Sequence, residues 1–474
     1  MINLKKYIIP AVLFASVAVS SCKKQDFEVA TELDPNAPPT ALYLTNANKA
    51  QIRQLGTGLQ SVVRSAFEDF GRVTGTVGRE IIFSASTDNR YFTELLGTNV
   101  AQYGGTAAGA NDPAGIFNTY YSAYSQTRRR AEQFIIASNN TNSITAAEKS
   151  AVIGFSRTIQ AYVTLNLANM QGKNGLRESF SDLFTPGDLL KPGKFGTYAS
   201  ALVVCKKYAD DGLAALNTAG TTAFPFTVNS GYGTFNNPSE FKKFNRAIAA
   251  RIAMYQMDWA GMSAALSASF LDLTGNLQAG PAFIFSTSPN DFTNRLFHVP
   301  NSSGAPYVVF NQVIADAEAG DARIFGVNAK VAARNSARNS GAFISTHESR
   351  LYKSNTSSAS IIRNEELILM YAEANVQLGG AGNVANAVSA INTIRTSYNL
   401  PVYTGAVTSA ALIDEILMQR RYSLFFEGHR WFDMRRYNRL ALIQPQGTIG
   451  GNSFVVFQAM SRPDAEVQWD IANP

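Results

Sequence analysis

The densest cluster of potentially reactive side chains in this 474-residue chain is the segment 420–436, RRYSLFFEGHRWFDMRR. It combines five arginines, one histidine and two acids with five aromatic residues. Three kinds of chemistry fit these residue types. The segment could form a catalytic or metal site of His, Glu and Asp, a basic patch for nucleic acid, or a helix whose charges pair with one another.

The spacing of the charges favours the third interpretation. In a helix, residues three and four positions apart are neighbours. The acids and arginines Glu427, Arg430, Asp433 and Arg436 alternate at intervals of three. Arginines beside His429 would repel a metal ion, and a nucleic-acid patch would not place acids inside its arginine run. We therefore predict that these four residues form a structural ion-pair network.

Catalytic motifs are missing from the rest of the sequence. The three histidines are His298, His347 and His429, and no HExxH, G-x-S-x-G, Walker A or zinc-type Cys/His pattern occurs. Cys205 lies in an apolar helical run, where a thiol behaves as a small hydrophobe. We expect no enzyme activity, no cofactor and no metal. A hydrolase with a carboxylate pair stays open as an alternative, because 35 acids offer many pairs.

The first residues have the pattern of an export signal. Lys5 and Lys6 precede an apolar run over 7–19 that is too short to span a bilayer. The run leads into small residues before Cys22, which resembles a bacterial lipobox. This resemblance implies that residues 1–21 form a lipoprotein signal peptide, that Cys22 carries lipid, and that the polar segment 22–40 is a tether.

The overall charge gives no reason to expect a polyanionic partner. The formal net charge is +6, which falls to +4 when Lys5 and Lys6 are removed, and 16% of the residues are charged. An excess this small over so long a chain argues against a nucleic-acid partner. The abundance of uncharged polar and aromatic residues suits a protein that binds neutral polar ligands.

Hydrophobic periodicity predicts a mainly α protein with few short strands. The helices are expected over residues 45–70, 117–138, 145–170, 197–217, 237–259, 363–378, 383–398 and 408–438. The later helices form short-linked pairs with alanines where they would cross, which resembles a tetratricopeptide-type scaffold. We expect a single domain over 41–474. Three long loops interrupt it, at about 71–115, 219–237 and 274–360.

Two segments near the end of the chain carry the resemblance to a known family. Residues 363–401 resemble an Arg-x-x-Glu-Leu-x-Leu-x-x-Ala-Glu helix followed by an Ile-Asn-x-Ile-Arg helix, and residues 420–436 resemble the segment Arg-Arg-x-Glu-Leu-x-x-Glu-Gly-x-Arg-x-x-Asp-Leu-x-Arg. Both motifs are typical of the SusD/RagB-like outer-membrane lipoproteins of Bacteroidetes. The matching positions are Arg363, Glu366, Leu367, Leu369, Ala372, Glu373, Ile391, Asn392, Ile394, Arg395, Arg420, Arg421, Leu424, Glu427, Gly428, Arg430, Asp433 and Arg436. Ser423 stands where the family often has an acid, and Met434 replaces a leucine.

The resemblance implies a SusD-like fold and a function in nutrient uptake. A member of this family would be lipid-anchored in the outer membrane and exposed at the cell surface. It would bind oligosaccharides without catalysis and deliver them to a SusC-like TonB-dependent transporter. Peptide binding, as in RagB-like members, stays open, as does a helical-repeat envelope protein that has no nutrient ligand.

The candidate ligand residues lie in the first and third loops, since long loops in compact domains are usually functional. Their aromatic rings suit stacking on sugar faces, and their Asn, Asp and Arg side chains suit contacts with hydroxyls. The candidates are Arg79, Asp88, Asn89, Arg90 and Tyr91 in the first loop, and Phe297, His298 and Tyr307 in the third.

Overall fold

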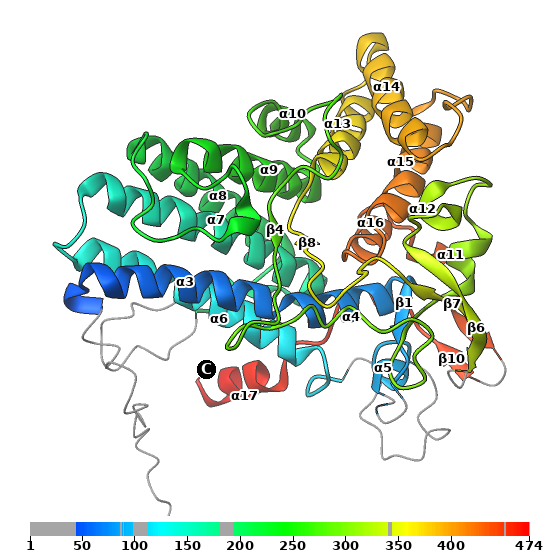
Figure 1. Cartoon of the computed structure of the whole chain (residues 1–474), viewed down its shortest axis with the longest axis horizontal. Helices are drawn as coiled ribbons and strands as arrows, with labels where there is room; N and C mark the ends of the chain where they lie inside the picture. The colour runs from blue at the N-terminus through cyan, green and yellow to red at the C-terminus, as the bar shows by residue number, and fades with distance from the viewer. Residues whose placement is uncertain are drawn as a thin grey trace, which may run out of the picture.

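The computed structural model describes residues 44–85, 88, 90–97, 112–179, 193–339, 344–449 and 452–473. Helices dominate it, as Figure 1 shows, so the predicted mainly α class is confirmed. The predicted signal peptide and the whole predicted tether, including Cys22, lie outside the described residues. Among the described residues, no helix is both long enough and apolar enough to cross a bilayer.

The long helices follow the predicted periodicity closely, and their caps explain where they begin. In α7 the backbone N–H of Glu148 donates to Thr145 Oγ1 at 3.2 Å, and Glu148 Oε2 accepts from the N–H of Thr145 at 2.7 Å. Asn237 caps α9 with Pro238 in the first turn. The main helices are α3 (Lys49–Ser65), α4 (Phe67–Val77), α6 (Asn118–Asn140), α7 (Ala146–Gln171), α8 (Tyr198–Ala219), α9 (Pro238–Gln256), α10 (Trp259–Ser267), α13 (Asn364–Leu378), α14 (Ala381–Ser397), α15 (Ser409–Ser423), α16 (Arg430–Arg436) and α17 (Asp464–Ala472).

Successive helices pack against one another in one continuous array. Helix α6 lies against α7, α7 against α8, α8 against α9, α9 against α10, α10 against α13, and α13 against α14 and α15. Small residues allow the close crossings: Gly154 of α7 faces Leu216 of α8, and Ala372, Ala387 and Ala390 are buried between the later helices. In Figure 1 the array runs from α6, beside α3 at the lower left, up to α14 at the top right.

A four-stranded antiparallel sheet lies beside the array, and its strands come from segments predicted as loops. The order is β1 (Ile81–Phe83), β5 (Tyr307–Val309), β7 (Ile344–Ser349) and β6 (Val331–Asn339). The predicted loops 71–115 and 274–360 therefore contain regular structure, including the end of α4, α5 (Arg90–Thr93), β4 (Ala282–Phe283), α11 (Asn311–Ala315), α12 (Ala322–Phe325) and β8 (Ala359–Ser360). Strand β6, VAARNSARN, lacks the alternation of apolar and polar residues that signals a strand.

The second predicted loop, 219–237, is part of the core. Its aromatic residues are buried and pack on α7 and α9: the Phe226 ring centroid lies 5.0 Å from that of Phe155, and the Tyr232 centroid lies 5.9 Å from that of Phe241. Burying aromatic side chains contributes strongly to stability. This loop therefore serves packing, and its aromatic rings are not available to a ligand.

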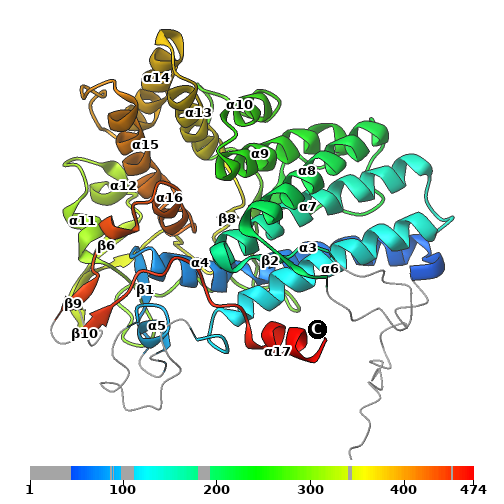
Figure 2. The same cartoon turned by 180° about the vertical axis from the view of Figure 1, so that it is seen from behind.

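The C-terminal helix α17 contacts residues from the first half of the chain. Arg177 of β2 (Leu176–Arg177) pairs with Asp470 at 2.7 Å, and Tyr121 of α6 donates its hydroxyl to Glu466 Oε1 at 3.2 Å. Figure 2 shows α17 beside the end of α6, away from α14.

Candidate ligand-binding surface

The first and third predicted loops meet at the pairing of β1 with β5. Phe83 lies directly opposite Tyr307 in this antiparallel pair, and their ring centroids are 5.0 Å apart. The Tyr91 ring lies edge-on to Phe83 at 5.1 Å. Since opposite residues of paired strands are neighbours, the pairing brings aromatic residues of both loops to one place.

Arg72 of α4 holds this aromatic group together. Its Nε donates to Tyr307 Oη at 2.6 Å, its Nη1 donates to Tyr91 Oη at 3.3 Å, and its guanidinium carbon lies 4.2 Å from the centre of the Phe83 ring. The guanidinium also pairs with Glu68, one turn earlier on the same helix. Burial favours the neutral form of Arg72, but Tyr307 and Glu68 outweigh it and raise the arginine's pKa, so Arg72 stays charged.

A cavity of about 140 Å³ lies along the junction of α3 and α4, and its wall includes Glu68, the partner of Arg72. The guanidinium carbon of Arg64 lies 4.0 Å from the centre of the Phe292 ring. The side chain of Arg295 is 71% exposed, and its Nε lies 3.5 Å from Glu68. The cavity is lined by Arg64, Ser65, Phe67, Glu68, Phe285, Phe292, Thr293 and Arg295.

The lining of this cavity suits a ligand that has both apolar faces and hydroxyl groups. Phe292 is partly exposed and offers a ring. Arg295 can donate hydrogen bonds, and Glu68 can accept them. Ligand pockets typically combine aromatic walls with a few polar groups that fix orientation. We refer to this cavity together with Arg72, Tyr91 and the neighbouring Asp88 and Arg90 as the Arg72 surface.

Several of the predicted ligand residues lie on or behind the Arg72 surface. Arg90 pairs with Asp88 at 2.8 Å, and the Arg90 side chain is 54% exposed. Tyr91 and Tyr307 are 7% and 1% exposed, so they position Arg72 and offer no free ring face. The His298 ring lies 5.7 Å behind Tyr307. Asn89 lies outside the described residues.

Two predicted residues lie elsewhere. Arg79 is buried, and its guanidinium donates to the carbonyl oxygens of Thr76 at 3.1 Å, Pro445 at 3.1 Å and Val455 at 2.7 Å. It ties the end of α4 to the C-terminal segment and cannot reach a ligand at the surface. Phe297 lines a separate cleft of about 360 Å³.

Sequence reasoning missed the charged residues at and beside the cavity. Arg64 and Glu68, which line it, fall within the predicted helix 45–70, which was assigned to the scaffold, and Arg72 lies just beyond that helix. Their spacing of four places them on one face of a helix. This row of alternating charge, next to a loop rich in aromatic residues, was the available signal.

The charged segment 420–436 lies in the interior, but it is not one helix. Helix α15 ends at Ser423 and α16 begins at Arg430, with a turn between them in which Phe426 has φ 61° and Gly428 has φ 85°. The prediction of a continuous helix is therefore wrong. Gly428 is the residue that permits the turn, because the left-handed region is costly for residues with a Cβ.

The turn changes which charges pair. Glu427 pairs with Arg363 before α13, and Arg430 makes no ion pair with Glu427 or Asp433 within the described part of the chain. Asp433 pairs with Arg436 at 3.0 Å, as the spacing predicts, and also with Arg420 at 2.7 Å. Burial raises the pKa of Asp433, but Arg420 and Arg436 outweigh burial and lower it to about 2.

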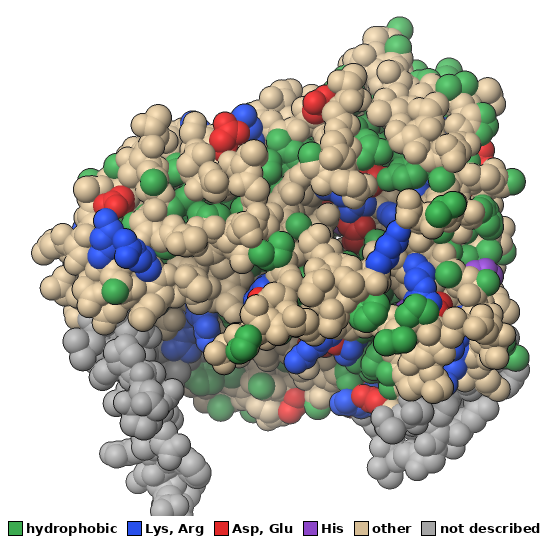
Figure 3. Space-filling model, in the orientation of Figure 1, with side chains coloured by type: hydrophobic (Ala, Val, Ile, Leu, Met, Phe, Trp, Pro, Cys, Tyr) green, Lys and Arg blue, Asp and Glu red, His purple; other side chains and the backbone are tan. Residues whose placement is uncertain are grey.

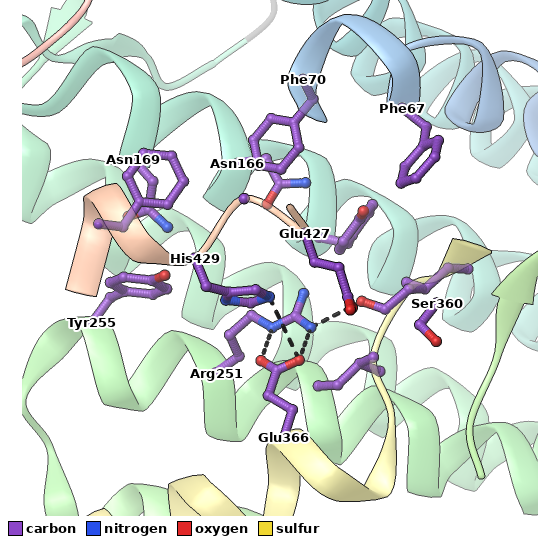
Figure 4. Close-up of a pocket in the computed structure, with 15 residues that line it drawn as sticks. Phe67, Phe70, Asn166, Asn169, Arg251, Tyr255, Ser360, Glu366, Glu427 and His429 are labelled. Carbon is purple, nitrogen blue, oxygen red and sulfur yellow. Dashed lines mark hydrogen bonds and ion pairs between the residues drawn. The ribbon is translucent and has the colours of Figure 1, made fainter. Parts of the chain in front are cut away.

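A second paired acid lies next to the turn, at a small interior cavity of about 30 Å³. Figure 4 shows Arg251, Glu366, Glu427 and His429 converging there beneath Phe70. Arg251 binds Glu366 through two hydrogen bonds of 2.6 and 2.7 Å. Burial lowers the pKa of His429 to about 4, so the imidazole is neutral near pH 7. The cavity has room for one water molecule and none for a nutrient.

The family motif residues thus have a structural explanation. Arg363, Glu366 and Glu373 of the first motif pair with Glu427, Arg251 and Arg436, so the motif ties α13 to α9, to α16 and to the turn before it. At Ser423 the hydroxyl accepts from Arg323 at 2.8 Å, where an acid would have added an ion pair. No group of three or more His, Cys, Asp or Glu side chains that could hold a metal occurs among the residues described.

Known proteins share the two motif segments and the fold described above. The sequence model of the SusD family matches residues 324–472, which contain both motifs. No curated protein matches the chain significantly.

Solved structures match almost the whole chain. A SusD superfamily protein from Bacteroides vulgatus shares 14% identity, with 89% of this chain and 97% of that chain covered and a TM-score of 0.60. A laminarin-binding SusD-like protein also shares 14% identity, with the same coverage and a TM-score of 0.62. The surface glycan-binding protein A from Bacteroides uniformis shares 13% identity over 89% of this chain and 98% of that chain, with a TM-score of 0.63. The predicted resemblance to the SusD/RagB-like family and its fold is confirmed.

Proposed function

Starting from a chain that has the SusD fold and the SusD family motifs, we propose that this protein binds oligosaccharides at the cell surface without catalysing a reaction. The Arg72 surface is the proposed binding site. The observation that carries the proposal is the cavity of about 140 Å³ where Phe292, Glu68 and Arg295 adjoin one another. A sugar ring has apolar C–H faces for the aromatic ring and hydroxyls for the carboxylate and guanidinium.

We further propose that the protein is anchored by lipid on Cys22 in the outer membrane and delivers its ligand to a SusC-like TonB-dependent transporter. The lipobox-like sequence before Cys22 and the family motifs support this role. Co-purification of a TonB-dependent transporter with the full chain, extracted from outer membranes in mild detergent, is expected. Recovery of the chain alone under conditions that preserve other outer-membrane complexes contradicts the proposed partnership.

Ligand binding can be tested by calorimetry with a panel of neutral oligosaccharides, including β-1,3-glucan fragments. We expect at least one of them to bind. Replacing the exposed Arg295 (R295A) or the aromatic Phe292 (F292A) should weaken that binding about tenfold, which corresponds to about 1.4 kcal/mol. The control is K207A on α8, since Lys207 is 68% exposed and lies outside the Arg72 surface.

The outcome separates the alternatives. Binding of peptides with no binding of any oligosaccharide overturns the sugar proposal and favours a peptide-binding protein. If an oligosaccharide binds but R295A and F292A behave like K207A, the ligand lies elsewhere on the molecule.

A further inference from the structure

A second cleft, distinct from the Arg72 surface, lies between the segment around Phe297 and the segments on either side of the β6–β7 hairpin. Its volume is about 360 Å³, which is within the range of small-ligand sites. It is lined by Phe297, Pro300, Gly326, Val327, Ala329, Val331, Ala332, Arg350, Tyr352 and Lys353. Among these lining residues the charged ones are two cations, Arg350 and Lys353. We refer to it as the Arg350 cleft.

We propose that the Arg350 cleft binds a carboxylate carried on a sugar ring, as in a uronic acid residue of an acidic oligosaccharide. This inference rests on the proposed function, since it names a class of oligosaccharide. It adds a second site, which differs in charge from the Arg72 surface.

The cations around the cleft outnumber the acids that pair with them. The acid closest to Arg350 is the fully buried Glu348, which is ion-paired with both Arg334 and Arg350 and accepts the N–H of Asn301 at 2.9 Å. One carboxylate thus faces two guanidinium groups. The neighbouring His298 adds no negative charge. One positive charge is therefore left over at the wall of the cleft.

Lys353 adds a second unbalanced positive charge. Its Nζ donates to the side-chain oxygen of Asn328 at 2.8 Å and has no acidic partner in the described part of the chain. The excess of positive charge also acts on His298. Burial lowers the pKa of His298, the nearby Arg350 and Arg334 lower it further, and it falls to about 4. An anion in the cleft would gain charge-assisted hydrogen bonds from both cations.

Aromatic and apolar side chains lie in and beside the cleft. The rings of Phe297 and Tyr352 line it. Val327, which lines the cleft, is 104% exposed, and Val299 and Phe325, each next in sequence to a lining residue, are 64% and 54% exposed. Exposed apolar side chains that gather at one place mark interaction sites. Figure 3 shows Lys and Arg side chains next to hydrophobic ones on this side of the molecule.

The excess positive charge and the apolar side chains together favour one kind of ligand. A neutral sugar would leave the cations unpaired, and an inorganic anion would leave the exposed apolar side chains uncovered. A uronate residue has a carboxylate for Arg350 and Lys353 and an apolar ring face for the partly exposed Phe297.

The test compares two trisaccharides of similar size with the full chain in detergent, by calorimetry: trigalacturonate and neutral galactotriose. We expect trigalacturonate to bind more tightly, and its affinity to fall as salt is raised from 50 to about 300 mM, because salt screens the exposed lysine. The variant K353Q should weaken trigalacturonate binding about tenfold. It should leave the binding of galactotriose, or of any neutral oligosaccharide found for the Arg72 surface, unchanged. The variant K207Q on α8 is the matched control.

The possible failures are distinguishable. Equal affinities for the two trisaccharides, or a K353Q variant that binds trigalacturonate like the unmodified chain, overturn the inference while neutral oligosaccharide binding leaves the proposed function standing. Binding of a hexaglutamate peptide but not of trigalacturonate overturns it in favour of an acidic peptide. If no oligosaccharide of either kind binds, the proposed function itself is wrong.

Discussion

At the scale of single residues, the same interior holds buried acids in opposite protonation states. Arg251 and then His429 outweigh burial at Glu366 and lower its pKa to about 2. Glu80 has no such partner: its Oε1 accepts the N–H of Phe426 at 3.2 Å, and its Oε2 has no hydrogen-bond partner within the described residues. Burial raises the pKa of Glu80 to about 8. Its environment thus favours a neutral carboxyl at neutral pH.

This difference predicts a pH-dependent stability. Because the folded pKa of Glu80 is raised above its unfolded value, the folded state binds more protons between about pH 4.5 and 8, and the free energy of unfolding should fall as pH rises through that range. In the variant E80Q, in which glutamine replaces Glu80, the decrease in the free energy of unfolding over that pH range should be smaller by on the order of 2 kcal/mol. Guanidinium unfolding at pH 5 and pH 8 measures it. The control is E240Q, at a partly exposed acid. Equal slopes for E80Q and the unmodified chain would contradict the assignment.

At the scale of elements, the decisive feature is the turn between α15 and α16. It turns the chain so that Glu427 meets Arg363, while Gly428 lies against Phe70 and Thr74 of α4. A Cβ on Gly428 would overlap the Phe70 ring, and the glycine also has φ 85°. Both effects oppose any larger residue at this position.

The variant G428A should therefore be strongly destabilised, by about 2–4 kcal/mol. The matched control is G220A at the end of α8, where φ is 61° but the space around the Cβ is open. That variant should lose only about 1 kcal/mol, from backbone strain alone. Chemical unfolding of both variants provides the measurement, and equal losses would mean that the overlap with Phe70 is relieved at little cost.

The elements also show how far sequence reasoning reaches. Helices with their own caps and apolar stripes, such as α7 and α9, were predicted within a few residues, because the signals are local. The sheet was missed, because β1 and β5 are short and their pairing joins residues more than 200 positions apart. The candidate site was predicted only in part, because it too is formed by residues that are distant in sequence. Tyr91 was among the predicted residues, whereas Arg72, which holds Tyr91 and Tyr307, fell at the start of the predicted loop 71–115 and was not singled out.

At the scale of the whole molecule, each proposed site combines parts of the chain that are distant in sequence. The Arg72 surface joins the α3–α4 junction to residues 285–295, and the Arg350 cleft joins the segment around Phe297 to the segments beside the β6–β7 hairpin. The motif residues pair in the interior, and Phe67 connects that interior to the Arg72 surface, because it lines both the cavity beside Glu427 and the cavity beside Glu68.

The proposed lipid anchor predicts where the molecule is found. Replacing Cys22 by serine (C22S) should move the protein from the membrane fraction to the soluble fraction and abolish labelling by a radioactive fatty acid, since acyl chains supply the membrane affinity. The control is C205A, because Cys205 is buried and should not carry lipid. Fatty-acid labelling that persists in C22S but disappears in C205A would contradict the assignment.

The hydrogen bonds from Arg79 to Pro445 and Val455 have a consequence for the time course of folding. They join residues 366 and 376 positions apart, so the end of α4 cannot complete its native contacts until almost the entire polypeptide has been synthesised. Contacts between residues so distant in sequence also slow the search for the native state. A newly made chain should therefore stay incompletely folded until its last residues are available.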